Sequence, residues 1–113
     1  MRILSKQDFL KTPAGTVFHN FEPSFFTGLY IKVSDYTFGH NDFVYQELLA
    51  PIDANNTSEL FELIDKAELE GADVPLDFKD STMREGLFDD EKMYAVLSKQ
   101  EVRGLIDALS ATL

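Results

Sequence analysis

Two stretches decide the fold of this chain: Thr16-Val17-Phe18-His19-Asn20-Phe21-Glu22 and Gly28-Leu29-Tyr30-Ile31-Lys32-Val33-Ser34. Side chains alternate in both of them with a period of two, and the β-branched and aromatic content is typical of β-strands. Residues 42–49 have the same character and predict a third strand. Residues 35–41 contain Gly39, so an antiparallel hairpin is the shortest connection. We therefore predict a three-stranded meander.

Helix signals flank this meander on both sides. Ser5 with Asp8 predicts a short first helix, which should end before Pro13. Asn56 with Glu59 predicts the start of a second helix, and Gly71 predicts its end. The apolar residues of this second helix have helical spacing and are expected to be buried: Leu60, Phe61, Ile64 and Ala67.

The last part of the chain predicts one more strand and one more helix. Residues 93–97 read as a fourth strand, and Ser98 with Glu101 forms a capping box. Residues 74–78 allow an edge strand, because proline is tolerated there, and residues 80–91 are expected to form an exposed acidic loop pinned by Leu87 and Phe88. The last helix has one apolar stripe: Val102, Leu105, Ile106, Leu109 and Leu113.

These elements predict a single α+β domain over residues 1–113. It consists of a curved antiparallel sheet of about four strands and three helices. The sheet could also close into a small barrel. The length of 113 residues fits one domain, and the 44% hydrophobic fraction is enough for one core.

Charge is concentrated in the middle of the chain. Residues 53–91 contain thirteen acidic and three basic residues, which accounts for the whole net charge of −10. Binding to nucleic acid through its phosphates needs clustered Lys and Arg, so the sequence argues against it, and an anionic membrane surface is disfavoured for the same reason. A basic protein partner fits this charge, and so does a solubilising role.

The composition narrows the chemistry further. There is no cysteine, which excludes disulfides and thiolate metal sites. No apolar run is long enough to span a bilayer, and Arg2 is soon followed by polar residues instead of an export signal, so we expect a cytoplasmic protein. No cofactor motif occurs.

Catalytic signals are weak. His19 and His40 are the side chains that titrate near neutral pH, but His19 lies in a strand and His40 in a turn sequence. No nucleophile elbow and no glycine-rich phosphate loop occurs. Asp89, Asp90 and Glu91 could hold a hard cation, which with His40 leaves a small metal-dependent enzyme as an alternative. We expect no catalytic residue and no metal site.

Two groups of residues are candidates for binding another protein. The first is acidic and would meet a basic surface, in the manner of a nucleic-acid mimic: Glu59, Glu62, Asp65, Glu68, Asp89 and Asp90. The second is an aromatic patch flanking the predicted turns, through which the chain could self-associate into a structural or assembly protein as a small homo-oligomer: Phe25, Phe26, Tyr36 and Phe38.

Two segments resemble short uncharacterised proteins encoded by bacteriophages and prophages. They are Leu4-Ser5-Lys6-Gln7-Asp8-Phe9-Leu10 with Pro13-Ala14-Gly15-Thr16-Val17-Phe18, and Glu85-Gly86-Leu87-Phe88-Asp89-Asp90 with Tyr94-Ala95-Val96. The resemblance implies no catalytic residue. It implies that the chain binds a host protein, as small acidic phage inhibitors of defence nucleases do. The leading hypothesis is therefore a non-enzymatic, acidic protein-binding module, such as a phage accessory or counter-defence protein.

Overall fold

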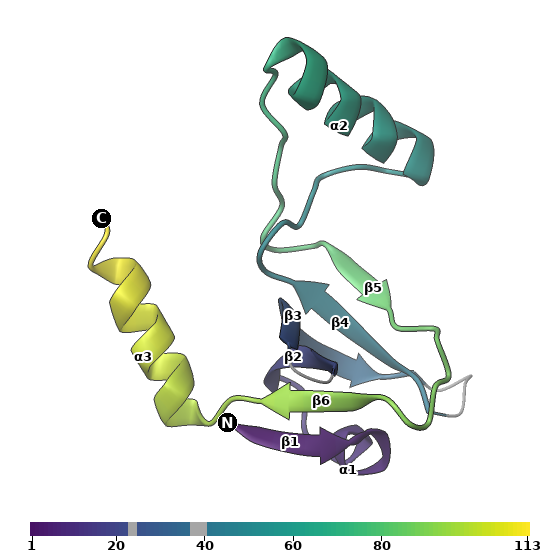
Figure 1. Ribbon diagram of the computed structural model, residues 1–113, viewed down its shortest axis with the longest axis vertical. Coiled ribbons are helices and arrows are strands. Elements are labelled where there is room, and N and C mark those ends of the chain that lie inside the picture. The colour runs from purple at the N-terminus through teal and green to yellow at the C-terminus, as the bar shows by residue number, and fades with distance from the viewer. Residues whose placement is uncertain (23–24, 37–40) are drawn as a thin grey trace.

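The computed structural model describes residues 1–22, 25–36 and 41–113. Figure 1 shows a sheet from which two helices extend. The strands lie in the order β1-β6-β2-β3-β4-β5, and each neighbouring pair is antiparallel. In chain order the elements are β1 (Arg2–Ser5), α1 (Lys6–Leu10), β2 (Val17–Glu22), β3 (Phe25–Asp35), β4 (Phe43–Glu47), α2 (Thr57–Glu70), β5 (Thr82–Arg84), β6 (Met93–Val96) and α3 (Lys99–Ser110).

The sheet corrects the predicted fold in two respects. It has six strands rather than about four, and it is open, because β1 and β5 are its two edges. The strands that the prediction lacks are these edges. Each is short and pairs on one side only, so its own residues show little periodicity. β5 lies inside the stretch that was expected to be an acidic loop, and residues 74–78 contribute a single bridge, Ile52 to Leu76.

Aromatic rings form the core between the sheet and α1. Phe9 of α1 is fully buried, and its ring centroid lies 4.3 Å from Tyr94, 4.7 Å from Phe18 and 4.9 Å from Phe43. These three partners come from β6, β2 and β4, so one ring of a five-residue helix joins three strands. Aromatic pairs at these separations add to the stabilisation from burial alone.

Lys32 is buried in this core, although it belongs to an alternating strand. Its ammonium donates to the carbonyl oxygens of Leu10 at 3.1 Å and Thr12 at 2.7 Å, and it pairs with Asp35 at 2.9 Å. The last carbonyls of a helix have no partner within the helix, and here Lys32 supplies one for the end of α1. The side of β3 that carries Tyr30 and Lys32 therefore faces α1.

Local capping chemistry is confirmed at all three predicted helix starts. Ser5 accepts a hydrogen bond from Asp8 N–H, Asn56 from Glu59 N–H, and Ser98 completes a full capping box with Glu101. Gly71 ends α2 with a φ of +70°, a left-handed conformation that favours glycine. Among the described helices, none combines the length and the apolar composition that a membrane crossing requires.

The two long helices extend away from the sheet, which corrects the burial predicted for the apolar residues of α2. Neither α2 nor α3 has a buried residue, and Phe61 and Leu109 are each 60% exposed. Figure 1 shows α2 standing off beyond β4 and β5, and α3 beyond the end of β6. The Cα radius of gyration is 15.6 Å, against about 13 Å for a compact domain of this length.

Glu101 makes the cap of α3 sensitive to acid. The Met1 amino group, then the Ser98 backbone N–H, donate to this carboxylate and lower its pKa from 4.5 to about 2. Because its pKa is lowered, the ionised Glu101 side chain stabilises the folded chain above pH 4.5. This stabilisation is lost as the pH falls towards 2. We expect the Glu101 carboxyl carbon to titrate near pH 2 by NMR. A midpoint near 4.5 would contradict the hydrogen bonds that the Met1 amino group and the Ser98 N–H donate to Glu101, and Glu101→Gln should remove the transition.

Candidate functional site

A row of carboxylates runs along α2. The predicted residues stand at every third position of this helix, where side chains are neighbours on its surface. Successive members advance about 4.5 Å along the axis. The row winds in the opposite sense to the helix itself, so it does not follow the right-handed path of a DNA strand. The row consists of Glu59, Glu62, Asp65 and Glu68.

The chain neutralises little of this charge. Glu62 pairs with Lys66 at 3.5 Å, and Glu59 Oε2 accepts from Asn55 N–H at 3.1 Å. Within residues 1–22, 25–36 and 41–113, the side chains of Asp65 and Glu68 form no ion pair or hydrogen bond. These two carboxylates are free to meet an external cation.

The position of these charges also works against the helix that carries them. Glu68 and Glu70 lie in the last turn of α2, which has no basic residue. Carboxylates are unfavourable there, because the C-terminal end of a helix has partial negative charge. Helix stability therefore accounts for Glu59 in the first turn but not for the carboxylates in the last turn. Side chains of this helix line a surface hollow of about 480 Å³: Asn56, Ser58, Glu59, Glu62, Leu63 and Lys66.

Asp89 and Asp90 belong to a different part of the molecule. They lie between β5 and β6, in the segment that Figure 1 shows running from β5 down to β6, away from α2. Asp89 accepts from Glu91 N–H at 3.0 Å, and Asp90 accepts from the Asn41 side chain. The six predicted acidic residues thus form two separate groups, and only the four on α2 form a row along one element.

The predicted aromatic patch is also divided. Phe25 and Phe26 are about half exposed at the start of β3, whereas Tyr36 follows its end. The eleven residues of β3 separate them by roughly 30 Å. Tyr36 also stacks with the Arg84 guanidinium, 4.5 Å from the ring centroid. Phe38 lies outside the described residues.

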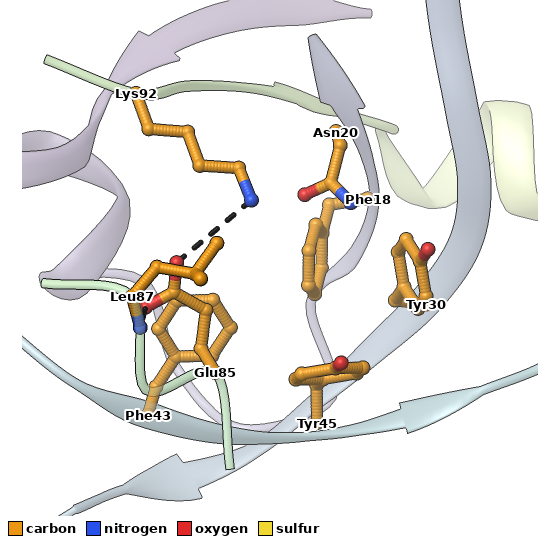
Figure 2. Close-up of a pocket in the computed structure, with 8 residues that line it drawn as sticks. All are labelled: Phe18, Asn20, Tyr30, Phe43, Tyr45, Glu85, Leu87 and Lys92. Carbon is orange, nitrogen blue, oxygen red and sulfur yellow. Dashed lines mark hydrogen bonds and ion pairs between the residues drawn. The ribbon is translucent and has the colours of Figure 1, made fainter. Parts of the chain in front are cut away.

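A pocket of about 160 Å³ opens beside the core, between aromatic rings and buried charges. Figure 2 shows Glu85 and Lys92 on one side of it and the rings of Phe18, Tyr30 and Tyr45 on the other. Burial raises the pKa of the Tyr30 and Tyr45 hydroxyls, so neither is a base at neutral pH.

Glu85 is the centre of a charge network that the sequence reading missed. Its carboxylate binds Lys6 Nζ at 2.9 Å, accepts from Tyr94 Oη at 3.3 Å and lies 3.8 Å from Lys92 Nζ. The Lys6 and Glu85 side chains are 1% and 5% exposed. Both carboxylate oxygens are occupied, which makes the group structural rather than a free acid or base. A volume of about 160 Å³ is also below the usual range of ligand pockets, about 300–1,000 Å³.

Asp42 and Arg84 fasten the next part of this loop. Asp42 Oδ1 accepts from the N–H groups of Phe43 and Gly86, each at 2.9 Å, while Oδ2 pairs with Arg84. Leu87 and Phe88, the predicted apolar pins, are 64% and 47% exposed, and the Phe88 ring centroid lies 5.4 Å from the Arg84 guanidinium, so neither side chain anchors the loop in the core. Glu85 follows directly after the end of β5 and lies in the stretch that the sequence grouped with the acidic loop, so no local pattern marked it as buried.

The described residues hold no group of three His, Asp or Glu side chains placed to bind a metal ion. Asp89, Asp90 and Glu91 are therefore consecutive without converging, because neighbouring side chains point in different directions. His19 Nδ1 is engaged by the Gly28 carbonyl, and His40 lies outside the described residues. Comparisons of the chain with protein-family models, with curated proteins and with solved structures found no match.

Proposed function

We propose that this chain is a non-enzymatic binding module, and that its helix α2 attaches to a basic surface of another protein. The observation that carries the proposal is the position of α2, which extends from the sheet with no residue buried and with unpaired carboxylates at Asp65 and Glu68. A helix in this position can be enclosed by a partner on several sides.

Apolar side chains on α2 provide contact surface beside its carboxylates. Phe61 is 60% exposed and Leu69 is 83% exposed, and both flank the carboxylate row. A helix of this kind fits an apolar groove with Lys or Arg at its rim. The carboxylates would then speed association and orient the helix, while the apolar side chains would supply the contact area.

The proposed partner is a protein and not a nucleic acid. The resemblance to small acidic phage proteins makes a host protein the natural class of partner, in a cytoplasmic setting that suits a chain without cysteine. Because the carboxylate row winds against the direction of a DNA strand, we propose general charge complementarity in place of close nucleic-acid mimicry.

Charge reversal on α2 should abolish capture of the partner. We expect the variant Glu62→Lys, Asp65→Lys, Glu68→Lys to lose a protein that the tagged wild-type chain captures from a bacterial lysate at low salt. Capture by the wild type should weaken between 0.1 M and 1 M salt, as the screening length falls from about 10 Å to about 3 Å. The thermal midpoint should hardly change, because the three side chains are exposed.

A matched variant separates this site from overall charge. Asp89→Lys, Asp90→Lys, Glu91→Lys changes the net charge by the same amount at the other acidic segment, and it should capture as the wild type does. Equal capture by all three chains, or equal loss by both variants, would overturn the assignment of binding to α2.

A further inference from the structure

Helix α3 has an apolar stripe that is partly buried near the start of the helix and exposed towards its end. Val102, Leu105, Ile106 and Leu109 have the i, i+3, i+4, i+7 spacing that places side chains on one face of a helix. Ile106 is 46% exposed and Leu109 is 60% exposed. In Figure 1 the helix continues past the end of β6 with no other element beside it.

The sheet has a second apolar face, on which no described helix packs. Phe18 and Tyr94 face α1, so their alternating neighbours face the opposite side of the sheet. The pairs Val17–Ile31 and Phe21–Met93 lie directly across from one another on that side. We call this the open face, and it consists of Ile3, Val17, Phe21, Ile31 and Met93 around His19, Leu29 and Ala95, of which Leu29 and Ala95 are buried.

No described helix packs on the open face. The buried helical residues, Lys6 and Phe9, belong to α1, while α2 and α3 have none. Ile3 and Met93 are each 38% exposed, and Val17, Phe21 and Ile31 are partly buried. A sheet that is apolar on both sides is ordinarily covered on both, so the open face needs a second layer.

The helix cannot supply this layer to its own sheet while its present start is intact. Leu97 N–H donates to Val17 O at 2.9 Å, which extends the pairing of β6 to the residue before the cap. Ser98 and Glu101 then close the capping box at once, with bonds of 2.9 and 3.1 Å. This junction sets the direction of α3, which leads away from the sheet.

Charge favours α3 over α2 as the element that meets a second copy. The charged residues of α3 balance, with Lys99 and Arg103 against Glu101 and Asp107. The rest of the chain therefore carries the net charge of −10, and its acidic helix would be repelled by another molecule of the same kind. A neutral, amphipathic helix and a neutral, apolar sheet face are complementary.

We propose that the chain forms a symmetric dimer in which each copy lays the stripe of α3 on the open face of its partner. A helix of twelve residues is about 18 Å long and about 10 Å wide, so a single such contact is small beside the roughly 800 Å² per partner of a standard interface. The reciprocal arrangement doubles the contact and has the self-complementary form of two-fold dimers. It leaves α2 free, and so does not depend on the function proposed above.

Sedimentation of two matched variants tests this dimer. We expect the wild-type chain to sediment at twice its monomer mass of 12.8 kDa. Ile106→Glu, Leu109→Glu should sediment as a folded monomer. Gln100→Glu, Gly104→Glu adds the same charge on the opposite side of α3, where a Cβ on Gly104 meets open space, and it should remain a dimer. A monomeric wild-type chain, or a dimer that survives Ile106→Glu, Leu109→Glu, would overturn the proposal.

Disulfide trapping shows which surfaces meet. The natural chain has no cysteine, so Met93→Cys, Leu109→Cys introduces the only two thiols, one on the open face and one on the stripe. Oxidation should give a covalent dimer that reductant separates. A monomer with an internal disulfide would show that α3 folds onto its own sheet, and would overturn the exchange between copies. The variant Met93→Cys, Gly104→Cys, with its thiol opposite the stripe, should cross-link far less.

Discussion

Replacing Glu85 with alanine is expected to lower the free energy of unfolding by about 3–5 kcal/mol, because it leaves the buried Lys6 ammonium without its counter-charge. The Lys6 and Glu85 side chains are 1% and 5% exposed, and the 2.9 Å ion pair is what makes burial of this lysine tolerable. The same change removes the acceptor of the Tyr94 hydroxyl. Urea unfolding followed by far-UV circular dichroism measures the loss, which would be a large part of the stability of a domain this size.

A double variant and a surface variant make this result specific. Lys6→Met, Glu85→Leu removes both charges of the ion pair, and we expect it to recover most of the stability that Glu85→Ala loses, with the lost partners of Lys92 and the Tyr94 hydroxyl as the remaining cost. Glu68→Ala removes an exposed carboxylate and should change stability by no more than about 0.5 kcal/mol. If Glu85→Ala cost less than the surface variant, the network would not be the structural centre that we describe.

Phe9→Ala should cost about 3–5 kcal/mol, since it empties the position where α1 joins three strands of the sheet. The ring is fully buried and lies within 5 Å of the rings of Phe18, Phe43 and Tyr94, at 4.7, 4.9 and 4.3 Å. Chemical unfolding of this variant and the wild type, monitored at equal protein concentration, measures the difference.

Phe61→Ala is the matched control for this second prediction. It is the same substitution, also within a helix, but Phe61 is 60% exposed on α2. We expect a change within about 0.5 kcal/mol. A cost as large as that of Phe9→Ala would mean that α2 packs against the sheet, which would contradict both the fold described above and the proposal that α2 is free to bind a partner.

Sequence reasoning was most successful where neighbouring residues decide the structure. Ser5, Asn56 and Ser98 begin helices because each side chain accepts from an N–H three residues on, and Gly71 ends α2 because it tolerates a positive φ. The meander was predictable for the same reason, since strand periodicity is a property of a short segment. The carboxylate row of α2 also follows from spacing alone, although its role in binding stays a prediction.

Only the tertiary structure decides which helix and strand surfaces pack against one another. Apolar spacing predicted burial of α2 and one apolar stripe on α3, but a stripe of side chains does not specify its partner, and both helices extend from the sheet. The edge strands β1 and β5 form because β6 and β4 offer them unpaired backbone groups. The buried charges of Lys6 and Glu85 are 79 residues apart and become a pair only in the folded chain. Local propensities act over a few residues, whereas pairing and desolvation depend on contacts that no short segment contains.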